Sequence, residues 1–172
     1  DTFKNVLYVP GMAEGGERTL VWVDRQGTTE TLPLPARSYL FPRISPDAKT
    51  LAYEVEGATH NLYSYDFARG VVTKLTTDGL SHAPVWTPDG QNLCYRSWKA
   101  GTMTMWEMPA DRSRPEERLT MTVGRQSAVS VSPDGRYLAY NQMASMGTGN
   151  QMAPKADGNQ MATTGAGSNM EP

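Results

Sequence analysis

Short apolar-rich segments separated by polar turns recur along the first 141 residues of the chain. Aromatic and β-branched residues are frequent in these segments, which is typical of β-strands. Because Gly, Pro, Asp and Asn cluster between them, we expect short strands joined by tight turns. Two of the recurring series are TLVWVD (19–24), NLYSYD (61–66) and TMWEMP (104–109), and TETLPL (29–34), VTKLTT (72–77) and EERLTM (116–121).

One nine-residue phrase occurs three times at nearly even intervals. Its copies are SPDAKTLAY (45–53), TPDGQNLCY (87–95) and SPDGRYLAY (132–140), with first residues 42 and 45 positions apart. The other series keep the same phase, so one unit holds four strand-like segments. A period of about 40–45 residues with four strands is typical of a β-propeller blade.

The start of each phrase predicts the turn of a β-hairpin. Proline fixes φ at the first turn position, aspartate caps backbone N–H groups, and glycine accepts a positive φ. Gly90 and Gly135 occupy the glycine position in two copies, and Ala48 occupies it in the other. If that position needs a positive φ, Ala48 costs on the order of 1 kcal/mol.

The strand order predicts an all-β fold of propeller blades, each with four antiparallel strands. The chain opens with the last three strands of one blade, continues with two complete blades (about 38–77 and 80–120), and ends with two strands of another (126–141). These three to three and a half blades are fewer than the four to eight of a closed propeller. We therefore expect a partial propeller, which a homodimer could complete.

After residue 141 the composition changes, so we divide the chain into blades (1–141) and a tail (142–172). The tail region repeats NQMASMGTG, NQMAPKADG and NQMATTGAG and carries half of the ten methionines. Its lack of aromatic residues predicts disorder, because too little apolar surface is available to offset the entropy of ordering. A methionine-rich metal or partner site is the alternative.

Composition excludes several classes of function. The 172 residues suit one domain, and a formal charge of −2 gives no reason to expect nucleic-acid binding. No apolar stretch reaches the roughly 20 residues of a membrane helix, so we expect no membrane insertion by this chain. It opens without methionine, as a mature or excised piece would. The single cysteine, Cys94, excludes an internal disulfide and is expected to be a small buried residue.

No catalytic motif, cofactor-binding motif or metal-ligand pattern is present, so we expect no catalytic residues, no cofactor and no metal site. Of the two histidines, His60 is expected in a solvated loop. His82 lies at the start of a blade's first strand, and in a propeller the first strand of each blade lines the central channel. Polar and aromatic residues there differ between blades, which is typical of a ligand-reading surface. The alternative is that these residues vary because they are exposed. Trp86, by contrast, is expected in the core and not in a binding surface. The candidate binding residues are Tyr39, Leu40, Ser81, His82, Gln126 and Ser127.

The blade phrases PRISPDAKTLAY, APVWTPDGQNLCY and SVSPDGRYLAY resemble the TolB-like (WD-like) β-propeller repeat. LVWVDRQG (20–27) and YDFARGVVTKLT (65–76) are also similar to the propeller region of some bacterial serine/threonine protein kinases. The resemblance implies a non-catalytic interaction or sensor module with a protein or peptide partner, often periplasmic or otherwise extracytoplasmic. The alternative is an accessory propeller of a larger hydrolase or peptidase, gating access of its substrate.

Overall fold

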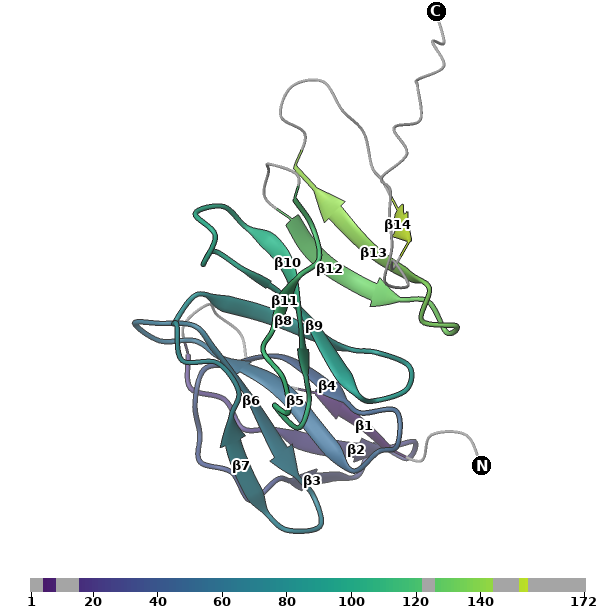
Figure 1. Ribbon diagram of the computed structural model, residues 1–172. Coiled ribbons are helices and arrows are strands. Elements are labelled where there is room, and N and C mark those ends of the chain that lie inside the picture. Colours follow the sequence, from purple (N-terminus) through teal and green to yellow (C-terminus); the bar gives the residue numbers. More distant parts are fainter. Residues whose placement is uncertain (1–4, 9–15, 122–125, 144–151, 155–172) are drawn as a thin grey trace, which may run out of the picture.

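The computed structural model describes residues 5–8, 16–121, 126–143 and 152–154. Within these residues every regular element is a β-strand, and the strands form four antiparallel sheets that follow one another in space (Figure 1). The first sheet contains β1 (Asn5–Tyr8), β2 (Val21–Asp24) and β3 (Thr29–Thr31). The second contains β4 (Tyr39–Ile44), β5 (Thr50–Val55), β6 (Asn61–Asp66) and β7 (Val71–Lys74).

The third and fourth sheets complete the described fold. The third contains β8 (Ser81–Trp86), β9 (Asn92–Ser97), β10 (Thr104–Pro109) and β11 (Glu117–Arg118). The fourth contains β12 (Gln126–Val131), β13 (Tyr137–Gln142) and β14 (Met152–Pro154). The first three sheets are sequential meanders, as expected of blades.

The predicted all-β partial propeller is confirmed. The two complete four-stranded sheets occupy 39–74 and 81–118, inside the predicted blade limits. They are flanked by an N-terminal sheet without its first strand and by the pair β12–β13. Most of the predicted tail lies outside the described residues. Within it, Met152–Pro154 pairs with β13 as an additional strand, and disorder of the tail stays a prediction.

The repeated turn has the left-handed conformation that the sequence suggested. Ala48 has φ 58°, and its counterparts Gly90 and Gly135 have φ 70° and 71°. In the Ala48 turn, the Ser45 hydroxyl donates to Asp47 at 2.6 Å and accepts from the Thr50 N–H at 3.0 Å. The same arrangement recurs in the other two copies. The turn therefore combines local side-chain bonds with one residue in a region that favours glycine.

The core lies between successive blades. Leu62 of the second sheet and Leu75, which directly follows β7, pack with Trp86, Leu93 and Tyr95 of the third sheet. The indole N–H of Trp86 also donates to the Arg43 carbonyl oxygen at 2.9 Å, across the two blades. The assignment of Trp86 to the core is thus confirmed.

The small residues in the second strand of each complete blade are buried as expected. Cys94 is 1% exposed, and its counterpart Ala52 is fully buried. Both strands have neighbours on two faces, so a small side chain leaves room for the adjoining blade. The prediction that Cys94 is a small buried residue is confirmed.

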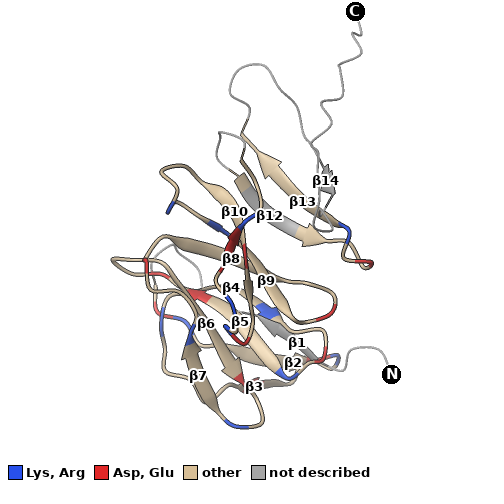
Figure 2. Ribbon diagram, viewed as in Figure 1, with Lys and Arg blue, Asp and Glu red and all other residues tan. Residues whose placement is uncertain are grey.

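Charges of both signs are interspersed over the described sheets and turns rather than gathered on one face (Figure 2). In this part of the chain there is also no helix of the length and hydrophobicity needed to cross a membrane.

Candidate functional site

The first strands of the second, third and fourth sheets, β4, β8 and β12, each carry a β-bulge, and in β8 the bulge builds part of a site. The ladder between β8 and β9 is interrupted between His82 and Val85, and Ala83 has φ 49°. Pro84 follows and has no N–H to offer to the ladder. The interruption turns the Ala83 N–H toward Glu54, where it donates to Oε2 at 3.0 Å.

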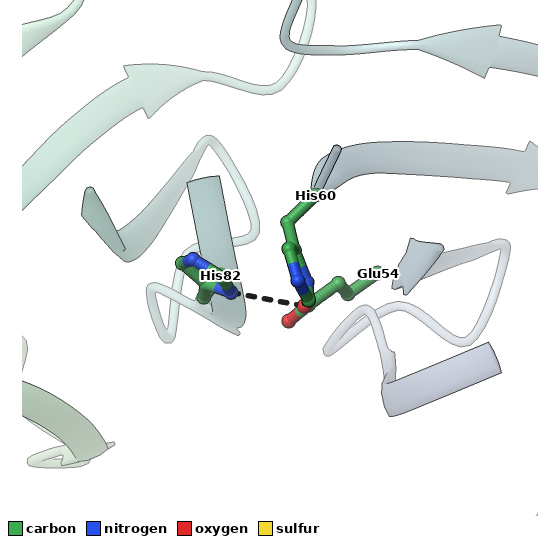
Figure 3. Close-up of side chains that lie close together, drawn as sticks. All are labelled: Glu54, His60 and His82. Carbon is green, nitrogen blue, oxygen red and sulfur yellow. Dashed lines mark hydrogen bonds and ion pairs between the residues drawn. The ribbon is translucent and has the colours of Figure 1, made fainter. Parts of the chain in front are cut away.

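Glu54 is a fully buried carboxylate at the centre of the site. A buried carboxylate is costly unless its oxygen atoms are hydrogen-bonded. The Nδ1 atoms of His60 and His82 lie 2.7 Å and 3.0 Å from Oε1 (Figure 3). With the Ala83 N–H on Oε2, both oxygen atoms have partners.

These contacts determine the ionisation of Glu54. Burial alone would raise its pKa, but the hydrogen bonds from His82, the Ala83 N–H and His60 outweigh burial, and the pKa is held below its ordinary value. The carboxylate is therefore ionised at neutral pH. Since an ionised carboxylate only accepts hydrogen bonds, each facing Nδ1 carries a proton in this arrangement.

The site joins two blades. Glu54 belongs to β5, His60 directly precedes β6, and His82 comes from β8 of the next blade. The His60 backbone is fixed to the start of β8, because its N–H donates to Gly79 O at 2.9 Å and its carbonyl oxygen accepts from the Ser81 N–H at 3.1 Å. The imidazole rings lie against each other, with centroids 4.4 Å apart.

The combination of residues is not repeated in the next blade. Glu54 pairs with Leu40 across β4–β5, and Arg96 pairs with His82 across β8–β9. Arg96 therefore occupies the position equivalent to Glu54. Likewise, Leu40 and Ser127 occupy positions equivalent to His82. The blade framework repeats, and this charged group belongs to one blade junction.

The six residues that the sequence singled out are the first two of β4, β8 and β12, which confirms their alignment at strand starts. The first residue of each strand is buried, and the second residue of β4 and of β8 is half-buried. For the second residue of β12 the side chain lies outside the described residues. In chain order they are Tyr39 and Leu40, Ser81 and His82, and Gln126 and Ser127.

The buried members of this set have structural partners. The Tyr39 hydroxyl donates to the Pro35 carbonyl oxygen at 2.6 Å. The Ser81 hydroxyl donates to Asp78 at 3.0 Å. The Gln126 amide N–H donates to Gln142 Oε1 at 3.0 Å, and its amide oxygen accepts from the Thr120 hydroxyl of the preceding blade. Of the five whose side chains the structure describes, His82 is the one that joins the Glu54 group. A binding role for the set remains a prediction.

Sequence reasoning missed Glu54 and assigned His60 to a solvated loop. The latter expectation is wrong, because the His60 side chain is 30% exposed and bonded to Glu54. One sequence signal could have identified Glu54. It stands within the strand TLAYEV (50–55), whose residues Leu51 to Glu54 are buried in succession. A charge in such a strand requires partners.

Both the sequence and the fold of the chain are similar to those of known proteins. A family model described as the TolB beta propeller domain matches residues 11–172. TolB from Acinetobacter baumannii superposes with a TM-score of 0.67 at 26% identity, over 83% of this chain and 36% of that structure. A TolB-type protein from Agrobacterium tumefaciens gives 0.63 at 25% identity, over 73% and 46%.

Two further comparisons are more limited. An uncharacterised protein from Agrobacterium fabrum is 34% identical over 93 residues, which is 53% of this chain and 31% of that protein. A prolyl endopeptidase shares the fold, with a TM-score of 0.66 at 17% identity, over 91% of this chain and 27% of that structure. The chain thus spans less than half the length of each of these proteins. The family match, which covers most of the chain, and the blade architecture agree: the chain belongs to the TolB beta propeller domain family.

Proposed function

We propose that this chain is a non-catalytic interaction or sensor module that binds a protein or peptide partner. The proposal includes an extracytoplasmic location, which rests on the family resemblance alone. The similarity of some segments to kinase-associated propellers also remains a prediction from the sequence.

The observation that carries the proposal is the contrast between a repeated framework and non-repeated strand starts. Turn and core residues recur from blade to blade, whereas His82 stands where the neighbouring blades have Leu40 and Ser127. Leu40 and His82 are both half-buried, so each retains accessible surface. A rigid scaffold that varies at such positions suits recognition of a partner.

The surroundings of the cysteine support a non-catalytic role. Cys94 is 1% exposed, and its sulfur lies 3.6 Å from the Glu107 carboxylate. A buried thiol beside a carboxylate has neither the access nor the electropositive setting of a reactive nucleophile.

The test is selection of binding peptides followed by quantitative titration. A displayed random-peptide library is panned on the full 172-residue chain in the presence of EDTA, and enriched peptides are titrated by fluorescence anisotropy. We expect Leu40→Ala and His82→Ala to weaken binding at least tenfold. Val72→Thr, on the exposed outer strand β7, is the matched control and should bind as the unmodified chain does.

Two results would contradict the proposal. One is failure to enrich any peptide, and the other is turnover of peptide substrates by the purified chain. The alternative of an accessory propeller on a hydrolase gains no added support, because the likeness to the endopeptidase is one of fold alone. A neighbouring coding sequence for a Ser-Asp-His hydrolase domain would favour it, whereas one for a kinase and membrane helix would favour the sensor.

A further inference from the structure

We propose that Glu54, His60 and His82 form a binding site for a divalent transition-metal ion of the zinc type. The chain has two histidines in total, and both reach the same buried carboxylate. One donor atom from each residue can be chosen so that all three lie within 4.8 Å of one another. This inference rests on geometry and is independent of the proposed partner-binding role.

The donor set selects the class of ion. Two imidazole nitrogens and one carboxylate oxygen suit zinc and its neighbours in the first transition series, whereas magnesium and calcium prefer oxygen ligands only. Two histidines and a glutamate, with a further position open to water, also form a known type of three-ligand zinc site. A fourth donor could come from water or from a bound partner.

The observed distances require only a small adjustment. Bonds of about 2.0–2.1 Å to a tetrahedral ion place its ligand atoms roughly 3.4 Å apart. The two Nδ1 atoms now lie 2.7 Å and 3.0 Å from Oε1 of Glu54. Side-chain rotations that widen these separations by about half an ångström would admit the ion between them.

Binding would require a change of tautomer at both imidazoles and no net release of protons. In the present arrangement the Nδ1 proton of each imidazole points to Oε1 of Glu54. A metal ion needs the Nδ1 lone pairs, so each ring would carry its proton on Nε2 instead. Glu54 contributes a carboxylate oxygen, which lies within hydrogen-bonding distance of both Nδ1 atoms.

The site is held in position but can be reached from solvent. The Ala83 N–H fixes Oε2 of Glu54 and so orients the carboxylate, as outer hydrogen bonds do in metal sites. The side chains of His82 and His60 are 14% and 30% exposed, which leaves an entry on the imidazole side. Arg96, opposite His82 on β9, is a nearby cation and opposes binding; its guanidinium stacks over Phe41.

The test is a zinc titration of the full chain after removal of metal with EDTA. Isothermal calorimetry should give one zinc ion per chain, and zinc should raise the thermal midpoint, because an ion that binds only the folded state stabilises it. We expect His60→Ala and His82→Ala each to weaken zinc binding at least tenfold. Glu56→Gln, a carboxylate two residues from Glu54 and outside the group, is the matched control and should bind zinc normally.

A spectroscopic measurement keeps the proposal testable if a variant folds poorly. Long-range ¹H–¹⁵N spectra of the unmodified chain report on both imidazoles, and one equivalent of zinc should shift both Nδ1 resonances. Unchanged resonances at saturating zinc would overturn the proposal. Unaltered zinc affinity in both folded alanine variants would overturn it as well and would place the ion elsewhere. Peptide binding measured in EDTA would be unaffected by either outcome.

Discussion

At the scale of single residues, the repeated turn shows how local chemistry shapes this fold. Each of its three copies places a Ser or Thr hydroxyl on an Asp carboxylate and one residue in the left-handed region. In two copies that residue is glycine, whereas in the first copy it is Ala48. The alignment of Ala48 with the two glycines suggests this positive φ from the sequence.

We expect Ala48→Gly to stabilise the fold by about 1 kcal/mol or less. Glycine relieves the left-handed strain of alanine but also adds freedom to the unfolded chain, so the two effects partly cancel. Urea unfolding of the variant and of the parent measures the difference. Gly135→Ala is the reciprocal control and should destabilise the fold. An added Cβ there meets no atom within 4 Å, so any loss of stability comes from the positive φ of that residue.

The aspartates of the same turn predict loss of stability in acid. The Ser45 hydroxyl and the Lys49 N–H hold the pKa of Asp47 below its ordinary value of 3.8, and Ser132 and Arg136 do the same for Asp134. A lowered folded-state pKa contributes stability above the unfolded pKa, and that contribution is lost as pH falls through the folded value. Titration of the carboxyl ¹³C resonances should give midpoints below 3.8; midpoints at or above it would contradict this account.

At the scale of elements, position in the blade decides which strands can carry charge. The inner strand β5 buries four successive residues, from Leu51 to Glu54, while every residue of the outer strand β7 is exposed. A glutamate in an exposed outer strand stays in contact with water. In a buried inner strand it costs free energy of folding unless it has hydrogen-bond or charge partners. The partners of Glu54 come from the segment before β6 and from the next blade.

The short strand β14 is the element whose contribution is easiest to measure. Its three residues pair with Tyr137 to Ala139 of β13, so truncation after Gln142 removes little pairing. We expect the thermal midpoint to fall by less than about 4 °C, the shift that roughly 1 kcal/mol produces in a domain of this size. Differential scanning calorimetry of both chains tests this. A fall of about 10 °C or more would show that residues 143–172 stabilise the blades.

At the scale of the whole molecule, the open series of blades raises the question of what completes it. A partial propeller leaves apolar strand residues at its two ends, and some of these are covered within one chain. Val21 is 6% exposed, while Val131 and Tyr140 pack against the cluster that contains Leu138. The end sheets also contain Val6, Tyr8 and Val129, whose side chains lie outside the described residues.

We propose that the 172-residue chain, when isolated, associates as a homodimer. Two copies of about three blades would give six or seven, within the range of closed propellers, and two-fold dimers are the commonest closed oligomers. Light scattering coupled to size-exclusion chromatography should give twice the mass of the 18.9 kDa chain. A cooperatively folded monomer at micromolar concentration would contradict the proposal.

The sequence by itself determined the blades, because what specifies a blade is local. Strand patterns, turn residues and the interval of 42–45 positions all act within one repeat, and the structure agrees with them at Ala48, Cys94 and Trp86. Repetition also made the divergent strand starts visible, and His82 was found in this way.

Only the tertiary structure decided that Glu54, His60 and His82 meet. Glu54 and His82 are 28 positions apart and lie in different blades, and no periodicity within a blade predicts contacts between blades. The packing of the blades and the bulge at Ala83 bring the two imidazoles and a backbone N–H to one carboxylate. Burial then makes those contacts strong, because a charge removed from water depends on the few partners that remain.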